Sequence, residues 1–247
     1  MKSQATLAPL LYVAFGGDTR GRNLPGEVMD ELIAIAQVLP SQQPGERLFD
    51  QGGRTDRIYM ARTGLLKGEV NNANGQRQVM DFYLAGDFLD IQSLFTLRHQ
   101  CRVETITTAT VISLPLREVL AIARHYPALQ DGLHKAIGRE LLKLDQVIYQ
   151  LCRRPVGARI ASFFLDLSER FQALGNEPRR FYFPARRADI ASLLMMDRAT
   201  FTRGFRELER DGLVTADGSE FRLLDPEGLR HLSLDDELTE TRQARKN

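Results

Sequence analysis

The sequence predicts an α+β protein with a β-rich N-terminal region, one long helix and a C-terminal winged helix-turn-helix. Three observations predict this. Short β-type runs alternate with glycine turns from Gly45 to Leu114. Apolar residues then recur every three or four positions after Pro127, as along one face of a helix. After Pro155 the patterns run helix, helix, short turn, helix and β-hairpin.

Composition limits the class of protein. The 247 residues are 43% hydrophobic and 26% charged, as in an ordinary soluble globular protein. No run approaches the roughly 18–20 apolar residues of a membrane span. The stretch from Leu7 to Gly17 contains a proline and lacks a clear cleavage site, so we expect a cytoplasmic N-terminal segment and no membrane partner.

The distribution of charge is more informative than the net charge of +1. From Arg153 to Arg222 there are 13 arginines, 10 acidic residues and no lysine. Arginine reads guanine and clamps phosphate with a planar fork of donors, so this region favours nucleic acid as a partner. The alternative is a composition bias of a GC-rich genome.

The two cysteines, Cys101 and Cys152, form no CxxC pair, and no HxxxH spacing occurs. We therefore expect no clustered metal site and no cofactor. Two cysteines in a chain of this size suit a reducing compartment.

The β-rich region follows a helix expected at Pro25 to Val38. The run Asn71 to Gly75, "NNANG", predicts a hairpin turn because asparagine and glycine tolerate positive φ. Several short strands at this spacing predict a sandwich or roll.

The long helix after Pro127 carries a narrow apolar stripe with nearly heptad spacing, which favours a homodimeric coiled coil. The alternative is packing against the protein's own β-domain. Pro155 should end the helix, and "CRRPV" (Cys152 to Val156) is a candidate hinge. The predicted dimer-interface residues are Leu133, Ile137, Leu141, Leu144, Ile148 and Leu151.

The C-terminal region begins with an amphipathic helix from Val156 to Leu174. A short strand is expected in "RFYFP" (Arg180 to Pro184), and a short helix from Arg186 to Leu194. The stretch Met195 to Val214 supplies a second helix, and a two-stranded hairpin is expected around Asp217 and Gly218.

The helix that begins at Asp197 is the one expected to enter a DNA groove. Asp197 is a good N-cap residue. Arg198, Thr202 and Arg203 would share the exposed N-terminal face, and the expected buried face consists of Phe201, Phe205 and Leu208.

The run from Arg187 to Val214, "RADIASLLMMDRATFTRGFRELERDGLV", resembles the DNA-binding motif of the CRP/FNR family of bacterial transcription factors. "YMARTGLLKGEV", "DFYLAGDF" and "VISLP" resemble the cyclic-nucleotide-binding-type β-roll of that family, and "LSERFQALGNEPRRFYFPARRADIASLL" is closer to its FNR branch. The likeness extends over nearly the whole chain. It implies a regulator that binds a palindromic DNA site as a homodimer, most simply an activator with RNA polymerase as a partner.

The resemblance also implies roles for individual residues. Arg203 matches the family arginine that contacts guanine. The neighbouring base-reading positions are Arg198, Ala199 and Thr202. The implied phosphate contacts are Arg187, Thr200, Arg206 and Ser219.

Two positions depart from the family pattern. Ala199 stands where most relatives carry glutamate, which accepts a hydrogen bond from cytosine, so we expect an altered half-site. Met195 stands where relatives usually have glycine. Either the turn is rebuilt there, or a positive φ is held at a cost of about 1–2 kcal/mol.

The resemblance gives little support for a known effector. The cAMP-binding type needs Gly-Glu and Arg-Ser pairs, which Asp90-Ile91 and His99-Gln100 replace here, and a Thr-Ser pair, which Leu144-Asp145 replaces. No cysteine precedes Cys101, which excludes an iron–sulfur cluster of the FNR type. Haem would require a histidine such as His99, which is more simply an ordinary surface residue.

We therefore expect a regulator that works without iron–sulfur cluster or cAMP. The alternatives are a regulator that binds a cyclic nucleotide or other small ligand, and a redox switch at Cys101 or Cys152, each of which could equally be an idle thiol. No nucleophile–base pair is apparent, so an enzyme is not expected. The expected organisation is an N-terminal segment at 1–24, a β-roll at 25–126, a dimerisation helix at 127–152, the winged helix-turn-helix at 153–232 and a polar tail at 233–247.

Overall fold

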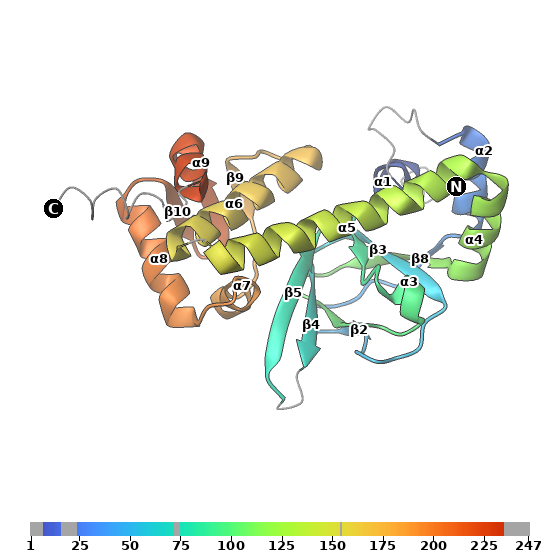
Figure 1. The fold of residues 1–247 in the computed structure, drawn as a ribbon, viewed down its shortest axis with the longest axis horizontal. Helices are drawn as coiled ribbons and strands as arrows, with labels where there is room; N and C mark the ends of the chain where they lie inside the picture. The colour runs from blue at the N-terminus through green and yellow to red at the C-terminus, as the bar shows by residue number, and fades with distance from the viewer. Residues whose placement is uncertain (1–6, 16–23, 72–74, 154, 235–247) are drawn as a thin grey trace. The chain divides into compact units, whose positions relative to one another are not determined.

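The computed structural model describes residues 7–15, 24–71, 75–153 and 155–234, apart from the side chains of residues 146 and 150–153. The chain forms two compact units, residues 1–142 and 143–247, which are described separately (Figure 1). Within the described ranges, no helix is long and apolar enough to span a membrane.

The first unit contains two four-stranded antiparallel sheets, with strand orders β1-β8-β3-β6 and β2-β7-β4-β5. This confirms the predicted β-roll. The strands are β1 (Gln37–Val38), β2 (Arg47–Phe49), β3 (Arg57–Thr63), β4 (Leu66–Asn71), β5 (Arg77–Tyr83), β6 (Phe88–Leu89), β7 (Arg102–Thr105) and β8 (Thr110–Pro115).

Successive residues of β3 face opposite sides of its sheet, as strand geometry requires. Tyr59 and Ala61 pack into a core with Leu66 and Val103 from the other sheet. Ile58 and Met60 instead join a second core, built with helices. The sheet is therefore buried on both faces.

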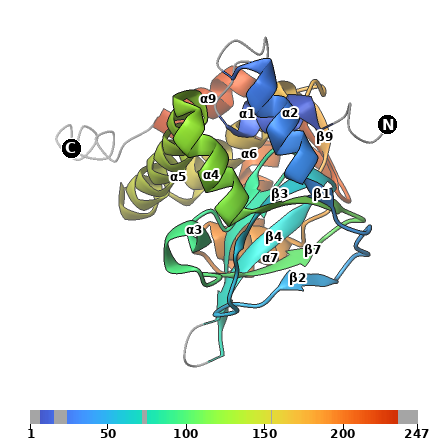
Figure 2. The same cartoon turned by 90° about the vertical axis from the view of Figure 1, so that its right-hand side faces the viewer.

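Helices cover the outer face of that sheet. They are α1 (Ala8–Ala14), α2 (Gly26–Ile35), α4 (Leu116–His125) and the first half of α5 (Pro127–Arg153), while α3 (Ser93–Thr96) lies in the loop between β6 and β7. Both α2 and α4 lie against β8, and the two helices contact each other on one side of the roll (Figure 2).

The N-terminal region differs from the prediction in two ways. No element was predicted in the N-terminal segment, but α1 forms and buries Leu11 and Phe15 completely in the helical core. The helix expected to reach Val38 ends at Ile35, because Ala36 is extended and Gln37–Val38 pairs with β8. Tertiary packing, and not local propensity, decides both outcomes.

The α1 helix is fastened to α5 by polar and steric contacts. The Arg139 Nη2 donates to the carbonyl oxygen of Ala14 at 2.5 Å. Gly132 leaves room for the Phe15 carbonyl, because a Cβ there would collide with that oxygen and lie 3.2 Å from its carbon. Burial lowers the pKa of Arg139, whose guanidinium faces this junction.

The apolar stripe of α5 serves two purposes. Leu133 is 7% exposed and belongs to the core of the first unit, and Ile137 is half-buried. Leu141 and Ile148 are each 58% exposed, and Leu144 is half-buried. The side chain of Leu151 lies outside the described residues. The start of the stripe thus packs against the protein's own first unit, which was the alternative to a coiled coil. Its later part is exposed.

The second unit has the predicted order of helices and strands. As expected, α5 ends before Pro155, which caps α6. The elements are α6 (Val156–Ala173), β9 (Arg180–Tyr182), α7 (Arg187–Leu193), α8 (Arg198–Arg210), β10 (Val214–Asp217), β11 (Glu220–Leu223) and α9 (Pro226–Leu234).

The wing differs from the prediction in two ways. The predicted hairpin gains β9 as a third strand, in the order β10-β11-β9. The last helix, α9, was not predicted and extends to Leu234, into the expected polar tail. Its signal was present in the sequence, since Asp225 caps it by accepting from the Gly228 N–H and Pro226 takes its first position.

The α1–α5 junction leads to a direct test with two glycines of one helix. Gly132→Ala should lower the free energy of unfolding by about 1–3 kcal/mol, because the added methyl meets the rigid Phe15 backbone. Gly138→Ala is the control: a Cβ there meets nothing within 4 Å, so helix propensity should raise stability by up to about 1 kcal/mol. Calorimetric unfolding of the full chain measures both. Equal effects of the two substitutions would contradict this account.

Candidate nucleic-acid interface

The turn between α7 and α8 is held by a pair of backbone hydrogen bonds. The Met196 N–H donates to the Ala191 carbonyl at 3.0 Å, and the Met195 N–H donates to the Ser192 carbonyl at 2.9 Å. This is the Schellman pattern, which places the residue after the helix cap in the left-handed region. Met195 occupies that position with φ of 52°. The turn is therefore not rebuilt to avoid positive φ: it holds a methionine in the conformation that favours glycine.

A half-buried arginine of α6 supports the same turn. The Arg159 Nη1 donates to the Leu194 carbonyl at 2.9 Å, and Leu194 is the C-cap residue of α7. Burial lowers the pKa of Arg159. Sequence reasoning missed this residue, because nothing in a helical pattern shows that one arginine points inward.

Asp197 begins α8 as predicted. Its carboxylate accepts the Thr200 N–H at 2.7 Å and the Thr200 hydroxyl at 3.0 Å. These hydrogen bonds hold the pKa of Asp197 below its usual value, the backbone bond contributing most. The cap fixes where the first turn of α8 starts, and so which residues face outward.

The inward face of α8 is also as predicted. Phe201, Phe205 and Leu208 are buried, and Phe205 lies 5.5 Å from Phe164 of α6 between ring centroids. Gly204 lets the helices approach, because a Cβ there would lie 2.8 Å from Ile160 Cδ1 and 2.9 Å from Val156 Cγ1. The core of the second unit is rich in phenylalanine, and its described part includes Phe163, Phe164, Phe181, Phe183, Phe201, Phe205 and Phe221.

The outward face of α8 brings together the residues expected to read bases. Arg198, Ala199 and Arg203 are exposed and Thr202 is half-buried. The Thr202 hydroxyl donates to the Arg198 carbonyl at 2.7 Å, and the Arg203 Nη2 lies 3.4 Å from the Thr200 hydroxyl. Arg206, on the same helix, is exposed. Within the described part of the chain, the guanidiniums of Arg198 and Arg206 make no hydrogen bond or ion pair.

The wing carries the remaining predicted contacts. Ser219 lies in the tight turn between β10 and β11, where Gly218 has φ of 58°. Beside it, Glu220 accepts from Arg180 at 2.6 Å and from Arg222 at 3.0 Å, and these guanidiniums lower its pKa. Arg187 is not presented to solvent in the way expected of a phosphate contact. Its Nη2 donates to the Gly218 carbonyl at 3.2 Å.

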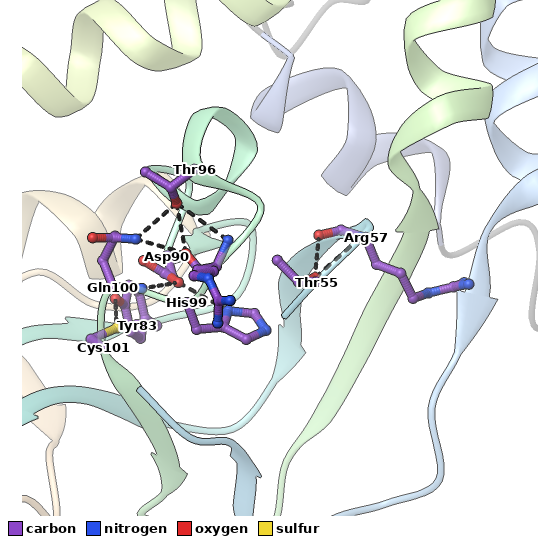
Figure 3. A network of polar contacts seen from close by, with 9 residues as sticks. Thr55, Arg57, Tyr83, Asp90, Thr96, His99, Gln100 and Cys101 are labelled. Atoms are coloured by element: carbon purple, nitrogen blue, oxygen red, sulfur yellow. Dashed lines mark hydrogen bonds and ion pairs between the residues drawn. The ribbon is translucent and has the colours of Figure 1, made fainter. Parts of the chain in front are cut away.

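In the first unit, the loop between β6 and β7 is held together by contacts to the carboxylate of Asp90, which lies within the loop. Asp90 Oδ2 lies 3.0 Å from His99 Nδ1 and accepts the Gln100 N–H at 2.9 Å (Figure 3). The side chains of Asp90 and His99 are 2% and 4% exposed. The His99 ring also stacks on Phe49, with 3.6 Å between centroids. The expectation that His99 is a surface residue is therefore wrong: it is buried in the roll by Phe49 and bonded to Asp90.

Cys101 lies beside this network and does not have the surroundings of a reactive thiol. Its Sγ is 3.8 Å from the Tyr83 hydroxyl (Figure 3). Burial, reinforced by the Asp90 charge, raises the pKa of Cys101 to about 12. A redox cysteine needs an accessible thiolate, so this environment favours the idle thiol. The side chain of Cys152 lies outside the described residues. Across the described part of the chain, no group of three or more His, Cys, Asp and Glu side chains could hold a metal ion.

A capped helix with an arginine-bearing outer face, set in a winged helix-turn-helix and joined to a β-roll by a long helix, defines a DNA-binding transcription regulator. Residues 158–232 match the Crp-like helix-turn-helix domain, and residues 41–126 match the cyclic nucleotide-binding domain. The chain belongs to the CRP/FNR family, which consists of transcription factors and not of enzymes.

Curated relatives agree with this assignment. The chain is 27% identical to the transcriptional activator protein Anr of Pseudomonas protegens, over 80% of this chain and 82% of that protein. It is 25% identical to the transcriptional regulatory protein btr of Bordetella pertussis, over 85% and 86% of the two chains. Among solved structures, FixK2 of Bradyrhizobium japonicum shares the fold with a TM-score of 0.72 at 20% identity, over 81% of this chain and 98% of that one.

The strained turn makes Met195 an informative position for mutation. Met195→Gly should raise the free energy of unfolding by about 1 kcal/mol, because relief of the positive φ exceeds the extra entropy of an unfolded glycine. Met195→Ala keeps the strain and should bring no gain. Calorimetric unfolding of the full chain measures both. A gain from alanine equal to that from glycine would show that the side chain, and not φ, matters.

Proposed function

We propose that this protein is a sequence-specific regulator that binds a palindromic DNA site as a homodimer, with activation as its main effect. The observation that carries the proposal is the outward face of α8. Arg198 and Arg206 have guanidiniums uncommitted within the described residues, and Arg203 stands beside them. Two such helices would enter successive major grooves about 34–36 Å apart.

Individual roles follow from where the side chains lie. We assign base contacts to Arg198, Ala199, Thr202 and Arg203. Phosphate contacts are assigned to Thr200 and Arg206, and to Ser219 at the tip of the wing. Alanine at 199 cannot accept a hydrogen bond from a cytosine amino group, so the half-site differs from the usual family sequence at one base pair.

Self-association is assigned to α5. Leu141 and Ile148 are one heptad apart, and each exposes 58% of its surface. Apolar residues repeated at that spacing bury well against an equivalent helix. Together with Leu144, and with Leu151 further along the stripe, they form the proposed seam. Leu133 and Ile137 support it from within the first unit.

The proposed regulator works without cAMP and without an iron–sulfur cluster. The buried carboxylate of Asp90 occupies the loop where cAMP-binding relatives hold a phosphate, and a second anion there would be repelled. The lack of cysteines before Cys101 removes the ligands for a cluster of the FNR type. Control by the abundance of the protein fits these features. We also propose a cytoplasmic location, where DNA and RNA polymerase are available as partners.

The match of residues 41–126 to the cyclic nucleotide-binding domain favours one alternative, a regulator that binds a nucleotide in an unfamiliar way. Titration calorimetry with cAMP and cGMP separates the two. We expect no heat of binding. A saturable signal of one nucleotide per chain would replace our proposal with the alternative.

The reading face is tested by a pair of arginines on one helix. Arg203→Ala should weaken binding to the selected site by about 1–3 kcal/mol and relax the preference at one base pair per half-site. Arg210→Ala is the control, because Arg210 lies at the other end of α8 and pairs with Asp211 at 3.0 Å. Mobility-shift titrations give both values. If Arg203→Ala binds the site as tightly as wild type, the assignment of base contacts to residues of α8 is wrong.

The seam is tested by two neighbouring leucines. Leu141→Asp should dissociate the dimer, because it places a charge in the apolar seam. Leu142→Asp is the matched control: Leu142 is 63% exposed but lies off the heptad stripe, so the dimer should persist. Sedimentation equilibrium of the full chain gives the mass. A dimer that survives Leu141→Asp would place the interface elsewhere.

A further inference from the structure

Arg187 opens α7 and is half-buried, with its guanidinium against aromatic side chains of the second unit. The guanidinium carbon lies 4.3 Å from the centre of the Phe221 ring and 5.0 Å from that of Phe205. One terminal nitrogen, Nη2, donates to the Gly218 carbonyl at 3.2 Å. A single side chain from α7 thus contacts α8, β11 and the turn of the wing.

These contacts suit a structural cation better than a DNA contact. Aromatic faces attract a guanidinium, and the attraction grows when water is excluded. The Gly218 carbonyl points at the same group from the wing. The other terminal nitrogen, Nη1, is buried and has no partner within the described residues. A nitrogen that solvent cannot reach is not available to a phosphate oxygen in this conformation.

We infer that Arg187 is a positioning residue that fixes the wing against α8, and that it does not contact a DNA phosphate. This replaces the role that the family resemblance implies. Ser219 follows Gly218 directly, so the bond to the Gly218 carbonyl also sets where Ser219 stands relative to the reading helix. The inference rests on the proposed function only where it concerns DNA binding. The contact between Arg187 and the wing is present in the protein without DNA.

The first test needs no DNA. Hydrogen exchange is followed in the full-length protein for wing peptides spanning residues 214–223 and for α6 as an internal reference. Arg187→Met keeps the apolar stem but removes the bond and the cation, and Arg187→Lys keeps only the charge. In Arg187→Met the wing amides should exchange about tenfold faster than in wild type, from the loss of the hydrogen bond and of the cation–π contacts. In Arg187→Lys they should also exchange faster, because the hydrogen bond and the planar stacking of the guanidinium are lost, and α6 should be unchanged in both variants. Arg206→Ala is the control and should leave the wing at wild-type rates.

Unchanged wing exchange in Arg187→Lys would overturn the inference. An equal rise in exchange across α6 and the wing would also overturn it, since Arg187 would then support the whole domain and not the wing. Arg187→Lys retains a long cationic stem, so it provides the test even if Arg187→Met does not fold.

The second test measures the salt dependence of DNA binding. Each substitution is present in both subunits of the dimer, so removing a phosphate contact should reduce the slope of log affinity against log salt by about 1.8, which is the result expected for Arg206→Ala. Arg187→Met should bind more weakly with an unchanged slope, and Arg187→Lys should not restore the affinity. A slope reduced by about 1.8, with affinity rescued by lysine, would assign Arg187 to a phosphate and overturn the inference. If wild type binds no DNA, the proposed function fails while the exchange test still decides the role of Arg187.

Discussion

The turn from Leu194 to Asp197 is the constraint on which the DNA-reading face depends. Two backbone hydrogen bonds close it, Arg159 holds its first carbonyl, and Asp197 caps the helix that follows. Together these contacts keep Met195 at a φ of 52°, which an isolated chain would avoid. Because the side chains of a helix are fixed by where the helix starts, this turn decides that the phenylalanines of α8 face inward and its arginines outward.

The sequence predicted the parts of this site that depend on local chemistry. The cap at Asp197, the alternation of buried and exposed residues along α8, and the unusual residue at 195 all follow from residue type and spacing. The inward arginines, Arg159 and Arg187, could not be predicted, because an arginine on a helix is equally compatible with water or with an aromatic core. Their direction is set by neighbours that are distant in the sequence.

The same distinction explains the fold. A nearly heptad stripe was enough to predict α5, and regular strand spacing predicted a sandwich or roll, of which the family resemblance selected the β-roll. The α1 helix was missed, since seven residues carry too little periodicity and its stability comes from packing against α5 through Gly132 and Arg139. The stripe of α5 was predicted as one dimer interface, but Leu133 is buried in the core of the first unit. In the roll, Asp90 and His99 fill their loop with an internal ion pair or hydrogen bond, an arrangement compatible with a regulator that needs no small-molecule signal.

Selection of bound DNA from a random pool tests the central claim most directly, when full-length wild type and Ala199→Glu are compared. The account predicts a palindrome with half-site centres about 10–10.5 base pairs apart. It also predicts that glutamate at 199 changes the preference at one symmetric pair of positions towards cytosine. Enrichment of no palindrome would contradict the account. So would identical sites for the two proteins, because the outward face of α8 would then not be the surface that reads DNA.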